Sequence, residues 1–139
     1  MATGARRPRI LLVDDYLEVR EMFSEYLQIH GFDVVEATNG IEALQRTLEV
    51  APDVILMDLS LPLMDGWEAT RRLKSDQRTA AIPVVAFTSH ALAGVARGAM
   101  QAGCEAFLTK PCLPEDLVKE IRRVLKVDSP ADNEEPLDR

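Results

Sequence analysis

The sequence has little cysteine, few aromatic residues and no long apolar run. It carries two cysteines in 139 residues, too few for a disulfide framework, and their spacing matches no metal-ligand pattern. No stretch reaches the ~18–20 apolar residues that a bilayer-spanning helix needs. The arginines near the N-terminus precede only a short apolar run, unlike a secretory leader. We therefore expect a cytoplasmic protein without membrane contact.

Motifs for nucleotide binding and for common covalent catalysis are also missing. The sequence has no GxGxxG or GxxxxGKS/T loop to cradle phosphates, and no GxSxG elbow or cysteine–histidine pattern to supply a nucleophile. Basic residues are outnumbered, 16 against 23 acidic ones, which gives a net charge of −7. Such an acidic chain disfavours direct binding to nucleic acid.

The two ends of the chain differ in composition from its middle. Residues 1–8 form a short basic arm that we expect to be flexible, and residues 128–139 carry five acids with almost nothing apolar. A segment of that kind cannot bury enough apolar surface to fold, so we predict a disordered acidic tail. Residues 9–127, within a chain that is 47% apolar, are predicted to form one domain.

Apolar runs alternate with amphipathic segments along that domain. Five runs are too short for separate helices and are predicted to be strands: Arg9–Val13, Phe32–Ala37, Val54–Met57, Ile82–Thr88 and Ala106–Thr109. The segments between and after them predict five helices: from Leu17 to just before Gly31, from a cap at Thr38 or Asn39 to before Pro52, Trp67–Lys74, Ala91–Ala102 ended by Gly103, and a last helix from Pro114.

This alternation predicts the fold class. Runs such as ILLV and VILM are apolar on both strand faces, which is typical of parallel strands covered by helices on both sides. Five strands alternating with five helices predict an open, doubly wound α/β sheet, because the chain is too short for an eight-stranded barrel. In such sheets, ligands bind beyond the carboxyl ends of the strands.

Polar residues stand at those strand ends. Asp14 and Asp15 follow the first strand, Asp58 follows the third, Thr88 ends the fourth and Lys110 follows the fifth. One aspartate after a strand is often only a helix cap, but five such residues at one edge predict a site. Two carboxylates ~4 Å apart repel by about 4 kcal/mol at an effective dielectric near 20, and a cation such as Mg²⁺ relieves this repulsion. Metal, ammonium and hydroxyl facing one carboxylate favour phosphoryl transfer onto it.

Four motifs in order carry a family resemblance. DD at 14–15, DLSLPLMDG at 58–66, TS at 88–89 and KP at 110–111 resemble the receiver domain of two-component response regulators, over about residues 9–126. The resemblance is to the stand-alone, chemotaxis-regulator-like type. It implies a flavodoxin-like (βα)5 fold with five parallel strands in the order 2-1-3-4-5, helices on both faces, and a signalling phosphoacceptor rather than a metabolic enzyme.

The resemblance also implies roles for single residues. Asp58 is the phosphoacceptor, and Lys110 contacts the phosphoryl group. Mg²⁺, which Mn²⁺ can replace, is held by the carboxylates of Asp15 and Asp58, by the backbone carbonyl of Ser60, and by Asp14 mainly through water.

Further implied roles concern switching. Thr88 swings toward the phosphoryl group after transfer, Phe107 is the switch aromatic, and the Lys110–Pro111 bond is cis. His90, two residues past Thr88, is either a modulator of phosphoryl lifetime beside the path of a hydrolytic water or an exposed loop histidine.

The helix expected at Ala91–Ala102 admits two interpretations. Gly94 and Gly98 each cost roughly 1 kcal/mol of helix propensity against alanine, and Arg97 is the only formal charge. The helix is therefore either weak enough to shift during signalling or built of small residues so that it packs close to the sheet.

The resemblance implies partners as well. A histidine kinase or a phosphotransfer protein supplies the phosphoryl group, and the signal leaves through protein contacts of the fourth helix, fifth strand and fifth helix. About a dozen residues follow the last helix, so we expect a stand-alone receiver, monomeric or weakly dimeric, with no DNA-binding output domain.

Three alternatives remain open. The first is a receiver excised from a hybrid kinase or a larger regulator. The second is a Mg²⁺-dependent phosphohydrolase that uses an aspartyl-phosphate, which would normally carry an aspartate where this chain has Ser60. The third is a structural adaptor with a degenerate site, which the complete set of site residues disfavours.

Overall fold

The computed structural model describes residues 6–89 and 94–126. Strands and helices alternate along the chain as β1 (Arg9–Val13), α1 (Leu17–Ile29), β2 (Asp33–Ala37), α2 (Gly40–Val50), β3 (Val54–Met57), α3 (Gly66–Ser75), β4 (Val84–Thr88), α4 (Val95–Ala102), β5 (Ala106–Thr109) and α5 (Pro114–Leu125). None of the helices in the described ranges is long and apolar enough to cross a bilayer.

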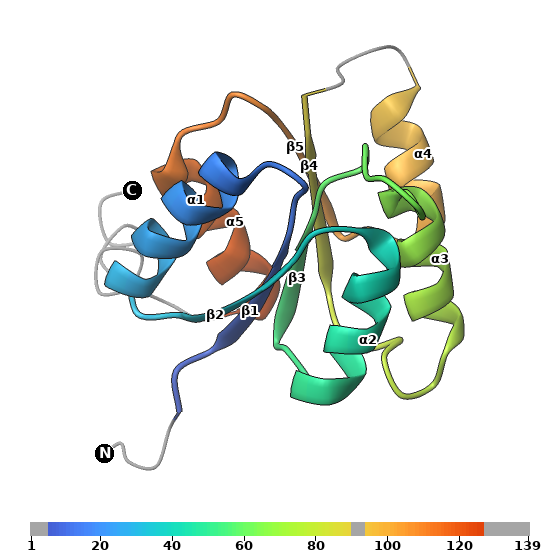
Figure 1. Cartoon of the computed structure of the whole chain (residues 1–139), viewed down its shortest axis with the longest axis horizontal. Helices are drawn as coiled ribbons and strands as arrows, with labels where there is room; N and C mark the ends of the chain where they lie inside the picture. Colours follow the sequence, from blue (N-terminus) through green and yellow to red (C-terminus); the bar gives the residue numbers. More distant parts are fainter. Residues whose placement is uncertain (1–5, 90–93, 127–139) are drawn as a thin grey trace, which may run out of the picture.

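All five strands run parallel in one sheet with the order β2-β1-β3-β4-β5. Helices α1 and α5 cover one face, and α2, α3 and α4 cover the other (Figure 1). The predicted flavodoxin-like fold is therefore confirmed, including the strand order. The change of winding direction after β1 leaves the carboxyl ends of β1 and β3 side by side, where a crevice forms in such sheets.

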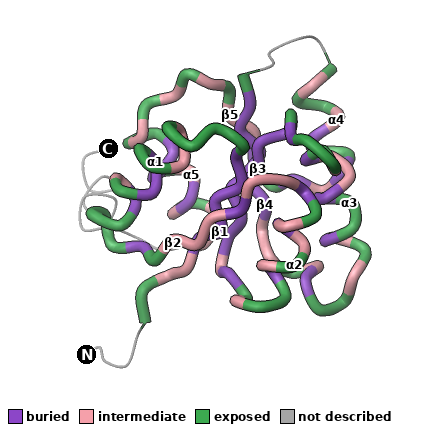
Figure 2. Tube along the Cα trace, in the orientation of Figure 1, coloured by how far each residue is buried: buried purple, intermediate pink, exposed green. Residues whose placement is uncertain are grey.

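Two apolar clusters hold the layers together. Alternate residues of the central strands point to opposite faces, so Leu11 and Val13 join the cluster under α2, α3 and α4, whereas Ile10 and Leu12 join the cluster under α1 and α5. Every residue of β3 is buried, and the central strands are buried along most of their length (Figure 2). Each such aliphatic side chain contributes about 1.5–3 kcal/mol by leaving water.

Two strands begin later than the sequence pattern predicts. Phe32 is outside β2 because its N–H donates to the carbonyl of Leu27 and closes the end of α1, at 3.1 Å. Ile82 and Pro83 are outside β4: the Ile82 N–H donates to the carbonyl of Thr79, at 3.0 Å, so the preceding turn extends to this residue, and Pro83 has no N–H to donate. These turn hydrogen bonds occupy the donors that a strand would use.

Helix ends follow local capping chemistry. Of the two predicted caps of α2, Asn39 is the one that caps, because its side chain accepts from the Glu42 N–H at 2.8 Å. Helix α4 begins at Val95 after Gly94, which has a φ of 87°. Residues 91–93 of the helix expected at Ala91–Ala102 lie outside the described residues.

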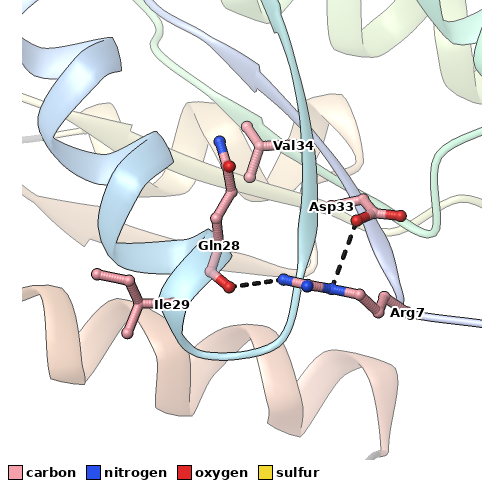
Figure 3. Close-up of a pocket in the computed structure, with 5 residues that line it drawn as sticks. All are labelled: Arg7, Gln28, Ile29, Asp33 and Val34. Carbon is pink, nitrogen blue, oxygen red and sulfur yellow. Dashed lines mark hydrogen bonds and ion pairs between the residues drawn. The ribbon is translucent and has the colours of Figure 1, made fainter.

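Arginines fasten the N-terminal segment to the end of the sheet away from the strand carboxyl ends. Arg6 pairs with Asp53 at 2.8 Å. Arg7 donates to the carbonyl of Gln28 at 2.6 Å and lies 3.4 Å from the Asp33 carboxylate, beside a shallow pocket that Val34 also lines (Figure 3). Residues 1–5 of the expected flexible arm and residues 127–139, which include the expected tail, lie outside the described residues.

Candidate functional site

Three carboxylates meet where β1 and β3 end. Asp14 and Asp15 follow β1, Asp58 follows β3, and one carboxylate oxygen of each lies within 4.8 Å of the other two. Asp14 is fully buried and Asp58 is 4% exposed, whereas Asp15 is exposed. The structure thus brings together three residues that lie up to 44 positions apart in the sequence.

Lys110 supplies the counter-charge for two of these carboxylates. Its ammonium contacts the Asp14 Oδ2 and lies 3.5 Å from the Asp58 Oδ2. It also lies 4.7 Å from the centre of the Phe87 ring, in a cation–π contact. The Lys110 backbone N–H donates to the Thr88 carbonyl at 2.7 Å, which fixes where the side chain starts, and the Lys110–Pro111 bond is cis.

Asp58 has a low-dielectric environment. Burial raises the pKa of its carboxyl above the usual value, although the Lys110 ammonium and a hydrogen bond from the Ser60 N–H, 3.2 Å from Oδ1, act in the opposite direction. Because the carboxylate has lost most of its hydration, it is poised to gain from any cation or electrophile that enters the site.

The raised pKa of Asp58 predicts how stability depends on pH. The folded state holds the Asp58 proton more tightly than the unfolded chain does, so its ionisation destabilises the fold as pH rises through the raised pKa. In the absence of divalent cations, Asp58→Asn should therefore be more stable than wild type at pH 7. The difference should vanish below the pKa of an unfolded aspartate, ~3.9.

Urea unfolding across this pH range measures the effect. Asp65→Asn is the control, because Asp65 is an exposed residue that caps α3 outside the carboxylate cluster. An Asp58→Asn variant that is less stable than wild type at pH 7 would contradict the prediction.

Gly66 permits the close approach of α3 to β3. A Cβ at this position would collide with the Asp58 carbonyl oxygen, and the Gly66 N–H donates to the Leu59 carbonyl at 3.1 Å. Gly66→Ala should therefore lower the free energy of unfolding by ~3 kcal/mol, the upper end of the usual cost of overpacking. Gly31→Ala is the comparison: its φ of 100° carries a backbone cost of about 1–2 kcal/mol, but its Cβ meets nothing within 4 Å. Equal losses in urea melts would contradict the steric argument.

Thr88 and Phe107 lie on adjacent strands. Thr88 is fully buried at the end of β4 and pairs in register with Thr109, two residues beyond Phe107. Phe107 is half-buried and packs against the cluster that contains Ala99 of α4. His90 lies outside the described residues, so its predicted role stays a prediction.

Trp67 and Gly98 join α3 to α4. A Cβ on Gly98 would lie 3.1 Å from the Trp67 Nε1, so the small residue permits close packing between the two helices. This contact supports the packing interpretation for Gly98, whereas Gly94 is the N-cap of α4 and has a left-handed conformation. Cys104 is also packed inside, where burial raises the pKa of its thiol to about 11.

Sequence reasoning missed one polar residue at this site, Arg20. Its guanidinium donates to the Asp14 carbonyl and to Glu36. Arg20 lies six positions after Asp14, in a helix that carries several other charged residues. The sequence alone does not distinguish it from an exposed arginine. The signal that would have revealed it is the pairing of β1 with β2, which brings Glu36 beside α1.

The fold and the carboxylate cluster define a class of signalling domain. The family model for the response regulator receiver domain matches residues 10–122. The chain therefore belongs to the response regulator receiver domain family of two-component signalling.

Individual relatives agree with this family. The chain is 35% identical over 129 residues to the phosphate regulon transcriptional regulatory protein PhoB of Pseudomonas aeruginosa, covering 93% of this chain and 56% of that protein. It is 34% identical to the polar-differentiation response regulator DivK of Brucella anthropi, covering 84% of this chain and 94% of that one. The chain spans about half the length of the transcriptional regulators that it matches.

Solved structures show the same likeness. The chemotaxis response regulator CheY4 of Vibrio cholerae superposes with a TM-score of 0.79 at 30% identity, covering 85% of this chain and 98% of that one. A signal receiver domain of a histidine kinase from Syntrophus aciditrophicus superposes with a TM-score of 0.80 at 29% identity, covering 86% of this chain and 90% of that one.

Proposed function

We propose that this chain is a phospho-switch that accepts a phosphoryl group on Asp58 from a phosphohistidine of a kinase or a phosphotransfer protein. The observation that carries the proposal is the arrangement around Asp58. A nearly buried carboxylate lies beside a lysine ammonium and two further aspartates at the carboxyl end of a parallel sheet.

The donor set fits a hard divalent cation, Mg²⁺ or Mn²⁺. Three clustered carboxylates and one ammonium leave excess negative charge, and oxygen ligands are those that Mg²⁺ prefers. Asp15, Asp58 and the Ser60 backbone carbonyl would hold the ion, with Asp14 acting mainly through water. When bound, the cation would neutralise charge that develops on the phosphoryl oxygens.

The chain's own residues supply the remaining chemistry. The Asp58 carboxylate attacks phosphorus, and its O–P bond forms as the N–P bond of the phosphohistidine breaks. The electron pair of the N–P bond stays on the departing imidazole, which leaves as a neutral ring because its other nitrogen already carries a proton. Lys110, already beside Asp58, neutralises the transferred group. Ser60 stands where an aspartyl-phosphate phosphohydrolase would carry a second aspartate, so we expect no turnover of phosphate esters.

Partner contacts are expected on two surfaces. An apolar cavity of about 300 Å³ lies beside Lys110, between α1 and the loop after β5, and its walls include Met22, Phe23 and Cys112. We propose that the phosphodonor packs here while its histidine reaches Asp58.

The output surface is proposed to be α4, β5 and α5, which Thr88 and Phe107 connect to the phosphorylation site. The free cysteines Cys104 and Cys112 support a reducing, cytoplasmic setting.

Metal dependence tests the proposal. Labelling of the protein by acetyl phosphate should require Mg²⁺ or Mn²⁺, and intact mass should increase by one phosphoryl group. Asp15→Asn should lower the apparent affinity for Mg²⁺ in the labelling reaction more than Asp14→Asn does, because Asp15 is exposed and is the proposed direct ligand. Millimolar Mg²⁺ should also raise the melting temperature by relieving carboxylate repulsion. Labelling that is unaffected by EDTA would overturn the metal assignment.

A further inference from the structure

Arg20 links the carboxylate cluster to the edge of the sheet. It stands near the start of α1, and its side chain is only 11% exposed. Its Nη1 donates to the Asp14 carbonyl oxygen at 2.7 Å, and its Nε donates to the Glu36 carboxylate at 2.9 Å. One guanidinium therefore ties α1, the end of β1 and the edge strand β2 together.

The hydrogen bond from Arg20 is one of four contacts that hold Asp14 in place. The Asp14 N–H donates to the Ala37 carbonyl at 3.1 Å, its Oδ1 accepts from the Tyr16 N–H at 2.9 Å, and its Oδ2 contacts Lys110. The carbonyl, which Arg20 binds, is the remaining polar group of Asp14. Every hydrogen-bonding group of this aspartate is thus occupied.

Asp15 is held in a different way. It is exposed, and within residues 6–89 and 94–126 no group donates a hydrogen bond to its carboxylate. Tyr16, the N-cap of α1, makes no side-chain capping bond either, so the turn between β1 and α1 is held by the hydrogen bonds of Asp14 and not by a capping side chain. The direction of the Asp15 side chain therefore depends on the peptide unit that joins it to Asp14, and the carbonyl of that unit is the one that Arg20 binds.

We propose that Arg20 is a positioning residue of the phosphorylation site: by fixing the Asp14–Asp15 peptide, it directs the Asp15 carboxylate toward Asp14 and Asp58 and so sets the affinity for the divalent cation. This inference rests on the proposed function of the site. Groups that orient metal ligands from outside typically change affinity 10–100-fold when they are removed.

Glu36 is the second partner of the Arg20 guanidinium. Its carboxylate holds the guanidinium in place and offsets a positive charge that would otherwise repel an incoming cation. Glu36→Gln keeps an acceptor for Arg20 but removes the offset, so it should lower metal affinity by less than loss of Arg20 does.

Direct metal titration distinguishes positioning from charge. Arg20→Met removes one positive charge near three carboxylates, so charge alone predicts tighter binding of Mg²⁺. Positioning predicts the opposite, a loss of about tenfold in affinity measured by calorimetry. Arg46→Met is the matched control, because the Arg46 side chain on α2 is 43% exposed and lies 3.9 Å from Glu49, a loose ion pair. Unchanged or tighter Mg²⁺ binding by Arg20→Met would overturn the proposal.

A double-mutant cycle shows whether Arg20 acts through Asp15. In an Asp15→Asn background, Arg20→Met should have little further effect on Mg²⁺ affinity, whereas additive losses would mean that Arg20 is merely structural. Without metal, Arg20→Met should speed hydrogen exchange at the amide of Tyr16, whose N–H donates to the Asp14 Oδ1, and unchanged exchange there would contradict the mechanism. If Arg20→Met does not fold, Arg20→Lys takes its place, because lysine keeps the charge but cannot span both acceptors.

The outcome is separable from that of the proposed function. If acetyl phosphate fails to label the wild-type protein, the phosphoacceptor proposal fails, while the exchange and titration results still decide the role of Arg20. If the wild type is labelled but Arg20→Met binds Mg²⁺ normally, only the inference about Arg20 fails.

Discussion

Asp58→Asn should lose all labelling by acetyl phosphate, whereas the wild-type protein in Mg²⁺ should gain one phosphoryl group. The amide is a poor nucleophile and cannot form the acyl phosphate, although it keeps the size of the carboxylate and can still accept from the Ser60 N–H. Intact-mass measurement reads the result directly.

Asp65→Asn is the matched control for this experiment. Asp65 lies in the same motif, it is exposed, and its side chain caps α3 by accepting from the Glu68 N–H at 2.9 Å, a role that asparagine can keep. Its labelling should equal that of wild type. Persistent labelling of Asp58→Asn, on Asp14 or Asp15 for example, would show that the phosphoacceptor has been wrongly assigned.

The fold was predictable because its signals are local. Three of the five strands have the bounds that the apolar runs predict, since β1, β3 and β5 are apolar segments bounded by polar residues. The errors arose at Phe32 and Ile82, apolar residues shortly before a strand that give their N–H to a turn. Apolar patterning indicates burial, and Phe32 is indeed buried, but it does not show where a backbone donor goes.

The site was only partly predictable for a different reason. Asp14, Asp15, Asp58 and Lys110 follow strands directly, and parallel topology brings such positions to one edge. Arg20 acts from the side of a helix through backbone and edge-strand partners, which no local pattern specifies. Gly66 is likewise explained only by the tertiary contact of α3 with the Asp58 backbone.

Thr88→Ala should uncouple phosphorylation of Asp58 from the response of the distal surface. Beryllofluoride with Mg²⁺, which mimics the phosphoryl group, should alter hydrogen exchange in the wild type most strongly within residues 88–110. Thr88 is fully buried at the end of β4, so its movement toward Asp58 would vacate space next to β5 that the half-buried Phe107 ring can fill. Because the contact of Gly98 with Trp67 ties α4 to α3, fluorescence of this single tryptophan offers a second measurement.

The Thr88→Ala protein should still be labelled on Asp58, but its exchange in 88–110 should not respond to beryllofluoride. Thr109→Ala is the control, because Thr109 is the exposed residue opposite Thr88 in the β4–β5 register, and its response should match wild type. A ligand shifts a two-state equilibrium only by its differential affinity for the two states, so a partial wild-type response is compatible with the switch. Changes confined to residues 58–66, with 88–110 silent in the wild type, would refute the switch and make a phosphate sink the better description of this protein.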